Sequence, residues 1–429
     1  MTKLSMKGRL LGLATLSTLM FGAGANASGL ERGGYNIDLL FEDSPYVGEA
    51  SSSFVMPNRR LKNVRDTDSS VIDPRLFGGR GVPGVGGGDL NNRPRTADDS
   101  ESYWSPRIGF KAGFGDAVDC MVDYSQPWGL HLKPGANWAG ANYNVETKVN
   151  SDNYAGTCSY KFDMGPGKLR LIGGAFYQKI DGFKDQLSQE YPAAFPLTGL
   201  GRLELEGDGW GWRAGVAYEI PEYAIRASLV YNSKVDVDLT GSIDASNVIP
   251  ISLSPITGVP RYGVSGSVSM PDSVELKLQS GIAEGWLAFG SIKWTDWSQI
   301  SVLNFCPPVL SPLSPRCSQL DLLFRDGLSI TGGVGHKFTD KLSGALSLTY
   351  DRGASTGINT QSDTWLLGTG LSYAATEKVE LRLAGAVGIL TSGSSGIVTR
   401  GGQAYGDNVS YDYDDDVVTA VSTAIKVKF

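Results

Sequence analysis

The residues whose chemistry is easiest to interpret are four cysteines, which fall as two close pairs, Cys120 with Cys158 and Cys306 with Cys317. An even number of cysteines favours disulfides in a chain exported to an oxidising compartment. The second pair would staple a proline-rich loop. The cysteines are too sparse, and too far in sequence from the histidines, for a zinc framework. We therefore expect two structural disulfides, no bound metal and no cofactor.

Enzyme chemistry needs an acid, a base or a nucleophile brought together in one site. The sequence contains no HExxH motif, and its two histidines, His131 and His336, have no recognisable partner residues nearby. We expect a protein that is not an enzyme. The question then becomes which structural elements these residues belong to.

The first residues have the form of an export signal. Three basic residues precede an apolar run over residues 10–23, and residues 25–27, Ala-Asn-Ala, supply the small side chains of a cleavage site. The apolar run is shorter than the roughly 20 residues that a membrane-spanning helix needs. We expect residues 1–27 to be a signal peptide and the mature chain to start at Ser28.

The composition is compatible with a membrane protein that has no membrane-spanning helix. Charges, glycines or prolines interrupt every later apolar run, and the mean hydropathy is only -0.12. A transmembrane β-barrel also averages out near neutral, because lipid-facing and lumen-facing residues alternate along its strands. The 56 glycines suit tight turns, and the net charge of -7 argues against nucleic acid as a partner.

Apolar and polar residues alternate with period two, the period of a β-strand, in many windows. In one window Val379, Leu381 and Leu383 share a face, while Glu380 and Arg382 lie on the other. We predict about 14 strands, an even number as such barrels have. The windows lie near residues 50–57, 107–114, 118–126, 152–162, 168–179, 209–219, 223–236, 264–281, 285–297, 325–338, 342–350, 363–374, 379–390 and 417–429.

The connections between these windows alternate strictly between short and long. Two or three residues make each short connection, and the long ones are polar or rich in proline and glycine: 58–105, 127–150, 180–208, 237–263, 298–324, 351–362 and 391–416. Outer-membrane barrels have short periplasmic turns and long external loops, whereas a soluble sandwich has no reason to keep its long loops at one end. The predicted fold class is all-β, a transmembrane antiparallel barrel over residues 50–429.

Two aromatic features support a bacterial outer-membrane location. The amphipathic last window ends in Phe429 and resembles the signal by which the barrel-assembly machinery recognises its clients. Trp286 and Trp294 share one face about 26 Å apart at 3.3 Å per residue. With a strand tilt near 45° this spans roughly the apolar band, so we expect these two side chains in the interfacial girdles of a Gram-negative outer membrane.

Several segments resemble the long-chain fatty acid transporter family of outer-membrane proteins (the FadL type). The resemblance runs over most of the mature chain and is best from Gly207 onward, where Gly207-Asp208-Gly209-Trp210-Gly211-Trp212 opens a strand as in the family. The order and spacing of the segments carry it: 207–212, 223–226, 231–235, 270–276, 294–298 and 324–327.

The resemblance implies a 14-stranded barrel plugged by a small N-terminal hatch, here residues 28–49. Leu30 would tuck toward the ligand pocket, and Pro45 lies in the nearest counterpart of the family's Asn-Pro-Ala element. The resemblance also implies a mechanism. External loops capture a hydrophobic ligand, an apolar pocket above the hatch binds it, and it leaves sideways where a kinked strand stops pairing.

Gln126-Pro127-Trp128-Gly129 falls where the family places this kink. Proline lacks the N–H that a strand ladder needs, and every strand of a closed barrel is central. Pro127, Trp128 and Gly129 therefore either end a strand at an ordinary loop or open the wall. A cross-link between Cys120 and Cys158 would hold the base of the wall below them.

A fatty acid carboxylate needs a cation or several donors, since burying it unpaired is costly. The resemblance makes Arg325 the first candidate, at a loop-to-strand re-entry, and Lys179 and Lys184 the next. Each of these is otherwise a solvated rim or lumen charge.

One external loop is unusually apolar, which suits either a capture groove for the ligand or packing of the loop on itself. Its candidate groove residues are Leu187, Tyr191, Phe195, Leu197 and Leu200. The acidic run over residues 411–416 either binds divalent cations that bridge lipopolysaccharide or is a solvated rim.

The favoured function is passive uptake of long-chain fatty acids. The alternatives are an aromatic-hydrocarbon channel of the same family, a general porin, or a surface barrel without transport, such as an adhesin. A porin would lack a plug and line its lumen with charge. The expected partners are the hydrophobic ligand, outer-membrane lipid with lipopolysaccharide, and the barrel-assembly machinery. We expect a monomer.

Overall fold

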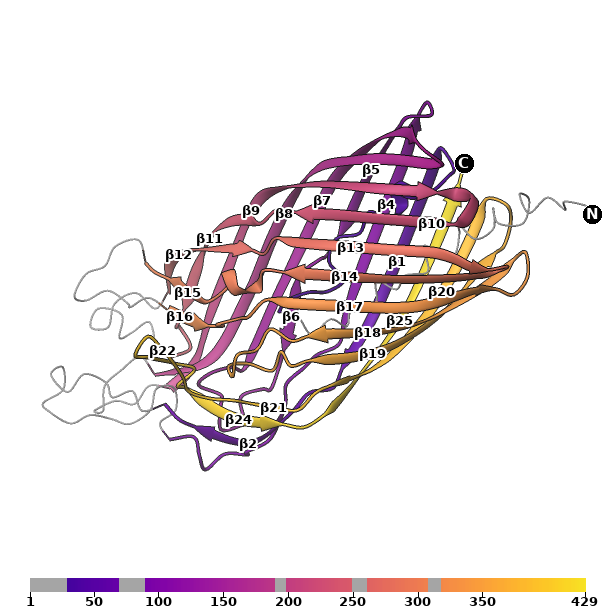
Figure 1. Cartoon of the computed structure of the whole chain (residues 1–429). Helices are drawn as coiled ribbons and strands as arrows, with labels where there is room; N and C mark the ends of the chain where they lie inside the picture. The colour runs from indigo at the N-terminus through magenta and orange to yellow at the C-terminus, as the bar shows by residue number, and fades with distance from the viewer. Residues whose placement is uncertain (1–28, 69–88, 190–197, 249–260, 308–317) are drawn as a thin grey trace, which may run out of the picture.

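The computed structural model describes residues 29–68, 89–189, 198–248, 261–307 and 318–429. The expected signal peptide lies outside them. The described strands close into one antiparallel barrel of 14 strands, which confirms the predicted fold class. The first strand, β1 (Tyr46–Pro57), pairs with the last, β25 (Asp416–Lys428), and this pairing closes the sheet (Figure 1).

Three barrel strands are each interrupted once, so that 17 sheet members make 14 barrel strands. In order around the barrel after β1 they are β4 (Tyr103–Phe114), β5 (Val118–Ser125) continued by β6 (Gly129–Leu132), β7 (Glu146–Met164), β8 (Gly167–Gln189), β9 (Thr198–Ile220), β10 (Ile225–Asn232) continued by β11 (Val235–Asp244), β12 (Arg261–Met270) continued by β13 (Ser273–Ala283), β14 (Trp286–Thr295), β17 (Gly327–Lys337), β18 (Leu342–Arg352), β19 (Thr364–Ala374) and β20 (Val379–Leu390).

Shorter elements belong to the connections and to the N-terminal segment. They are the 3-10 helices η3 (Asp38–Phe41), η5 (Pro221–Tyr223) and η7 (Trp297–Gln299), and the strands β2 (Arg60–Asp66), β3 (Ala97–Asp98), β15 (Val302–Phe305), β16 (Ser318–Asp321), β21 (Gly393–Ser395), β22 (Val398–Arg400), β23 (Gln403–Tyr405) and β24 (Val409–Tyr413). In the part of the chain that the structure describes, no helix has the length and apolar character needed to cross a membrane.

The exposure of the side chains alternates along the strands, as the period-two pattern of the sequence predicts. On β14 the side chains of Trp286 and Ile292 are 41% and 49% exposed, whereas Leu287 and Phe289 are 0% and 7% exposed. Trp294 shares the outward face with Trp286. Exposed apolar side chains on one face of every strand are what a barrel in lipid requires, because lipid and not water surrounds them.

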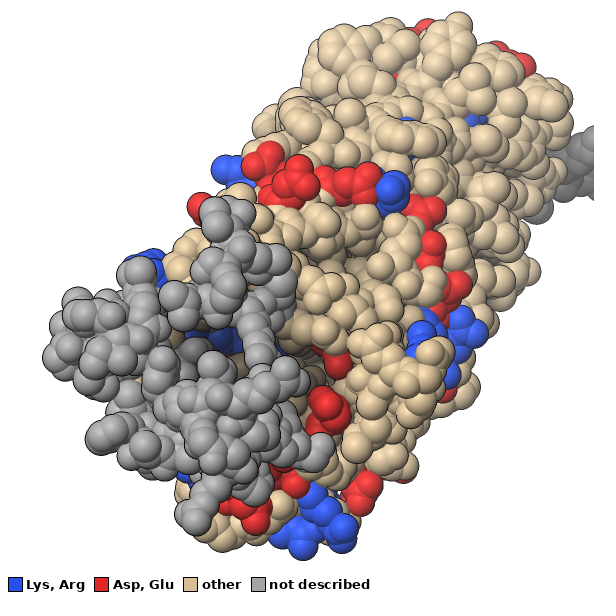
Figure 2. Space-filling model, turned by 90° about the vertical axis from the view of Figure 1, so that its left-hand side faces the viewer, with Lys and Arg blue, Asp and Glu red and all other residues tan. Residues whose placement is uncertain are grey.

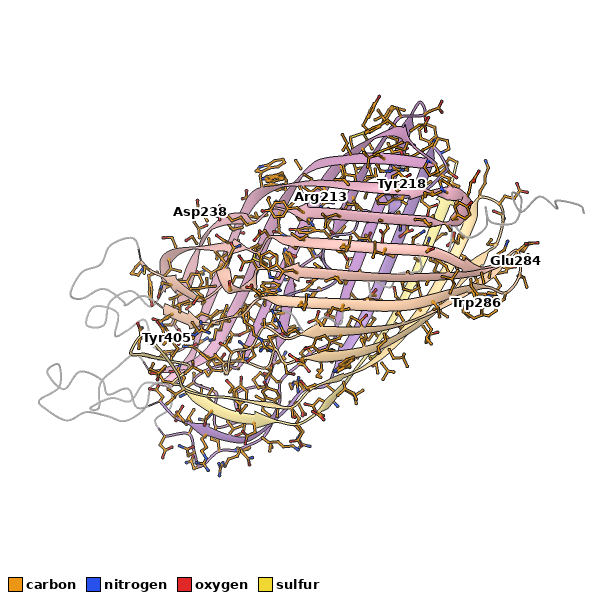
Figure 3. All side chains as sticks on the ribbon, viewed as in Figure 1. Arg213, Tyr218, Asp238, Glu284, Trp286 and Tyr405 are labelled. Carbon is orange, nitrogen blue, oxygen red and sulfur yellow. A yellow bond between two sulfur atoms is a disulfide. The ribbon has the colours of Figure 1, made fainter. Side chains whose placement is uncertain are left out.

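Long and short connections lie at opposite ends of the barrel, as the sequence predicts. Figure 3 places Glu284 and Trp286 at the end with the short turns, and Asp238 and Tyr405 at the other. The C-terminus lies at the short-turn end (Figure 1). Figure 2 looks onto the loop end, where the charged side chains gather, while the barrel surface behind them is largely free of charge.

Several strands extend beyond the predicted windows, and two of these differences affect the expected hatch and loops. β1 starts at Tyr46, before residue 50, because residues 46–49 already pair with β4 and β25. The segment 180–208, expected as a loop, is mostly strand: β8 and β9 pair as far as Gln189 opposite Thr198. Their polar outer residues hid this continuation, since strands that extend beyond the membrane need not be apolar on the outside.

Candidate ligand pathway

Residues 29–45 lie against the inward faces of strands on opposite sides of the barrel. Glu31 forms an ion pair with Lys293 of β14, and Glu42 forms one with Lys426 of β25. Both glutamates are at most 8% exposed. Removing one partner of a buried ion pair leaves an uncompensated charge, so each pair holds the segment strongly in place.

The helix η3 lies nearer the short-turn end of the lumen. The carboxylate of Asp38 pairs with Lys277 at 3.0 Å, and Arg170 donates to the carbonyl oxygen of Leu40 at 3.1 Å. Leu40 is fully buried. Pro45, one of the predicted hatch residues, is exposed, and its carbonyl oxygen accepts the N–H of Gly113 at 2.7 Å, directly before β1 begins.

The wall changes its pairing at the predicted kink. The ladder between β4 and β5 ends at Arg107 opposite Ser125, whereas β7 pairs first with β5 and then with β6. Between β4 and β6 no ladder is formed by the described residues. Residues 126–129 therefore stay attached to the β7 side and leave the β4 side, as expected where Pro127 has no N–H to donate.

The N-terminal segment occupies the place that β4 leaves. The N–H of Arg32 donates to the carbonyl oxygen of Pro127 at 2.8 Å, and the N–H of Gly129 donates to that of Leu30 at 2.7 Å. On the other side, the hydroxyl of Ser105 donates to the carbonyl oxygen of Arg32 at 2.8 Å. Three residues of a separate segment thus bridge the interrupted wall.

Trp128, at the kink, points into the lumen and is 1% exposed. Its ring lies edge-on to Tyr35 at 5.6 Å and to Trp297 at 5.2 Å between ring centres. Leu30 packs against the same cluster. This lumen cluster consists of Tyr35, Trp128, Ala155, Phe176, Ile180, Val235, Val237, Leu239, Val264, Val268, Met270, Trp297, Ile300, Phe305, Phe324 and Ala354.

Two cavities flank the N-terminal segment at the interrupted wall. The upper cavity encloses about 670 Å³, its open mouth included, and its lining contains Val55, Tyr103 and Leu130. The lower cavity encloses about 1040 Å³ on the same measure and has a polar lining that includes Arg107 and Asp123. Arg32 lines both cavities, whereas Gly129 lines only the upper one.

The three predicted cations lie in different surroundings. Arg325 is 46% exposed at its side chain; its Nη2 pairs with Asp363 at 3.0 Å and its Nε donates to the carbonyl oxygen of Gly353 at 2.8 Å. Lys179 is exposed on the outward face of β8, away from the lumen. Arg325 is therefore already paired, and Lys179 points away from the lumen cluster.

Lys184 lies inside the external part of the barrel. Tyr177 and Trp210 form an outward-facing ring pair, and charged residues follow on that face, so the apolar band ends below Lys184. The ammonium of Lys184 lies 4.6 Å from the ring centre of Tyr143. Burial lowers the pKa of Lys184 to about 8, and the carboxylate of Asp321 opposes this shift.

The predicted capture groove is described only in part. Leu187 and Leu200 pack in a second apolar cluster formed by the external loops, in which Trp138 is 1% exposed. Tyr191, Phe195 and Leu197 lie outside the described residues. Leu187 and Leu200 thus pack against other residues of the external loops.

The acidic run at residues 411–416 makes hydrogen bonds within the chain. Asp412 accepts a hydrogen bond from the side chain of Asn63, Asp414 from that of Lys62, and Asp416 from that of Arg59. Asp415 accepts one from the backbone N–H of Ser392. In the parts of the chain that the structure describes, no group of three or more His, Cys, Asp or Glu side chains is arranged to hold a metal ion.

The disulfide between Cys120 and Cys158 is confirmed, with the two residues directly opposite each other on β5 and β7. The neighbouring side chains Val122 and Tyr160 on the same face are exposed, so the disulfide lies on the outer surface of the wall below the kink. Cys306 is also disulfide-bonded, and its expected partner Cys317 lies outside the described residues.

The histidines have partners that the sequence did not reveal. The Nε2 of His131 lies 3.0 Å from a carboxylate oxygen of Glu146, and the Nδ1 of His336 lies 3.1 Å from the carbonyl oxygen of Gly285. Residues 353–357 read Gly-x-Ser-x-Gly, a pattern found around nucleophilic serines. Here the hydroxyl of Ser355 donates to the carbonyl oxygen of Ile358 at 2.9 Å, as in an ordinary loop.

None of the buried arginines was among the sequence candidates, and two of them, Arg213 and Arg32, lie beside the lumen cluster or the interrupted wall. Arg213 on β9, labelled in Figure 3, is 2% exposed. Its guanidinium lies over the rings of Tyr35 and Phe176 at 5.3 and 5.2 Å. The alternation along β9 already assigns it to the inward face, next to the outward-facing Trp212. Arg32 belongs to the N-terminal segment, where no strand periodicity exists to reveal its direction.

The comparisons with known proteins agree with this architecture. Residues 85–426 match the family model described as outer membrane protein transport protein (OMPP1/FadL/TodX). The chain is 23% identical over 393 residues to a long-chain fatty acid transport protein of Salmonella typhi, covering 84% of this chain and 86% of the relative. It is also 23% identical over 409 residues to the protein of the same name from Escherichia coli O6:H1, covering 86% and 87%.

Two solved structures share the fold. A Pseudomonas aeruginosa FadL homologue has a TM-score of 0.72 at 15% sequence identity, with 91% of this chain and 92% of that chain covered. The P. putida toluene transporter TodX has a TM-score of 0.59 at 12% identity, with 95% and 98% covered. At these identities the likeness concerns the fold alone.

Proposed function

This chain belongs to the outer membrane transport protein family OMPP1/FadL/TodX, and from that premise we propose that it takes up long-chain fatty acids passively. External loops capture the ligand, the lumen cluster binds its alkyl chain, and it leaves sideways at Pro127, Trp128 and Gly129. Residues 29–45 act as the hatch. The protein itself is a β-barrel of the Gram-negative outer membrane.

The observation that carries the proposal is the interrupted ladder beside β4. The segment 30–32 bridges it with single backbone and side-chain hydrogen bonds. A wall closed in this way needs only a local shift of the hatch to open, because no continuous strand pairing has to be broken. An opening at this height would connect the lumen cluster, through Trp128, directly with the membrane.

A straight exit toward the short-turn end is opposed by charge. Asp119, 2% exposed, pairs with Lys111 at 3.1 Å, Lys161 at 2.7 Å and Arg170 at 2.8 Å. Passing an alkyl chain through this layer would separate buried ion pairs, which costs several kcal/mol. A sideways exit avoids that cost, since the surroundings of the wall are apolar.

Lys184 is the best placed of the three predicted cations to meet the ligand carboxylate first. It faces the interior of the loop region and is half-buried, and a partly desolvated ammonium gains from an incoming anion. Arg325 already shares its charge with Asp363, and Lys179 faces outward. We therefore place Lys184 ahead of Arg325, and Lys179 outside the path.

The test is uptake of labelled oleate by cells that lack their own outer-membrane fatty acid transporter. Wild-type protein should restore uptake, and Pro127→Ala should reduce it, because an N–H at this position favours a continuous wall. Pro221→Ala, an exposed proline in the short turn η5, is the matched control and should leave uptake unchanged. A surface-exposed, folded barrel without oleate uptake would contradict the proposal.

A second candidate function is uptake of aromatic hydrocarbons. The observation that favours it is the edge-on arrangement of Tyr35, Trp128 and Trp297, which suits a flat aromatic guest. Labelled toluene in the same cells distinguishes the two ligands. Uptake of toluene without oleate would favour this candidate, and large ion currents through the purified protein would favour a general porin.

A further inference from the structure

We propose that Arg32 binds the anionic head group of the ligand at the partition between the two interior cavities. This inference rests on the proposed function and specifies its substrate class: a long-chain monocarboxylate, not a neutral hydrocarbon. The guanidinium of Arg32 receives the carboxylate as the ligand passes from the upper cavity toward the interrupted wall.

The guanidinium is buried and incompletely satisfied. Arg32 is 5% exposed, and neither its Nε nor its Nη2 has a hydrogen-bond partner among the described residues. Its Cζ lies 4.2 Å from the ring centre of Tyr103, which offers a cation–π contact. Leaving charged donors buried without acceptors is unfavourable, so the site gains free energy when an anion arrives.

The two unpartnered atoms are the ones that a carboxylate recognises. Nε and Nη2 project from the same edge of the guanidinium plane, and their N–H bonds are parallel. The two oxygens of one carboxylate match this edge in a bidentate pair. A hydroxyl can satisfy only one of these donors, and a hydrocarbon can satisfy neither.

The position of Arg32 places this edge on the path. Arg32 lines both cavities. It lines the upper cavity together with Tyr103 and the lower cavity together with Ser105. After it leaves the lumen cluster, the alkyl chain would meet the apolar side chains of the upper cavity: Val55, Tyr103, Leu130, Leu132, Leu390 and Val418. A ligand held there would have its head group directed at the partition.

Of the other charged residues that line the upper cavity, Glu31 and Arg59 are paired elsewhere, and Glu101 is an exposed carboxylate. Glu31 pairs with Lys293, and Arg59 pairs with Asp416 at 3.3 Å. In the lower cavity, the next arginine along the wall, Arg107, donates to the carbonyl oxygen of Gly34 at 2.8 Å. Arg32 is thus the cation that stands between the two spaces with hydrogen-bonding capacity left over.

The surrounding chain is shaped to hold and to release this side chain. A Cβ added to Gly129 would lie 2.6 Å from both Cζ and Nε of Arg32, so the guanidinium fills the space left by the missing side chain. Gly33 and Gly34, directly after Arg32, have φ values of 117° and 58°. This left-handed backbone favours glycine and gives the segment a natural hinge.

The test is ligand binding to the purified full chain in detergent. The probes are 9,10-dibromostearate and the corresponding dibrominated stearyl alcohol, detected by quenching of tryptophan fluorescence. Arg32→Gln should weaken binding of the carboxylate about tenfold to a hundredfold, as loss of charge-assisted hydrogen bonds does. Binding of the alcohol should change less than twofold. Arg32→Lys should give an intermediate loss, because an ammonium lacks the bidentate edge.

Arg400→Gln, an exposed arginine on β22, is the matched control and should leave both affinities unchanged. Heat-modifiable migration on gels verifies that each variant is folded, and Arg32→Lys carries the test if Arg32→Gln does not fold. Equal loss of both probes, or no loss of either, would overturn the role of Arg32 while the uptake function stood. A wild-type protein that bound neither probe would overturn both, and one that bound only the alcohol would overturn the monocarboxylate class.

Discussion

The backbone N–H of Arg32 donates a 2.8 Å hydrogen bond to the carbonyl oxygen of Pro127, and this bond joins the N-terminal segment to the point where the barrel wall is interrupted. A residue from the N-terminal segment therefore completes a wall built from a strand nearly a hundred positions later. Under the proposed mechanism, movement of the segment would open the wall, because this hydrogen bond joins the two.

We predict that Gly129→Ala loosens this closure. The added methyl group would lie 2.6 Å from the guanidinium of Arg32, and overpacking of this kind costs about 1–3 kcal/mol. The midpoint of heat-induced unfolding on gels should fall. Gly156→Ala is the matched control, because a Cβ there meets nothing within 4 Å. Equal midpoints for the two variants would contradict the close fit of Arg32.

The ion pair between Glu31 and Lys293 should keep the hatch seated. Glu31→Gln leaves the buried ammonium of Lys293 without its partner, which costs about 3–5 kcal/mol. We expect larger and more frequent ion currents through the purified protein in planar bilayers, because the hatch spends more time displaced. The double variant Glu31→Gln/Lys293→Met removes both charges and should recover the low current. Currents unchanged by the single substitution would show that the pair does not hold the hatch.

Binding of a carboxylate at the external loops should depend on pH through Lys184. Burial lowers the pKa of this ammonium to about 8, so it is charged below that pH and neutral above it. Carboxylates stay ionised across the range, since they titrate near pH 4. Decanoate affinity, measured below its aggregation concentration, should therefore fall as the pH rises from 7 to 9. Lys184→Arg should abolish the dependence, and a wild-type affinity that is flat over this range would exclude Lys184.

The disulfide between Cys120 and Cys158 should stabilise the wall below the kink. Replacing both cysteines by serine removes a covalent link between β5 and β7, for which about 2–4 kcal/mol is typical. The heat-modification midpoint should fall, and the effect of reductant on the wild type should shrink in the double variant. The second disulfide is the internal control, because it stays intact in this variant. An unchanged midpoint would mean that strand pairing alone supports the base.

Much of the architecture is readable from local patterns in the sequence. Alternation along β14 separates the lipid-facing Trp286 from the buried Leu287, and the regular spacing of short turns indicates the strand order. The extension of β8 and β9 beyond the membrane was missed, because charged residues on their outer faces resemble those of a loop. The interruption of the ladder could be predicted at Pro127, because proline has no N–H to donate to a neighbouring strand.

The sequence by itself determined the strand count, the two faces of each strand and the end of the barrel that carries the loops, because period two and turn composition are local properties. Only the tertiary structure decided which inward side chains meet. Glu31 and Lys293, or Arg32 and Gly129, come together because the barrel closes and a segment without periodicity enters it. Contacts across the lumen depend on where each strand lies around the barrel axis. Alternation along a single strand does not encode that position.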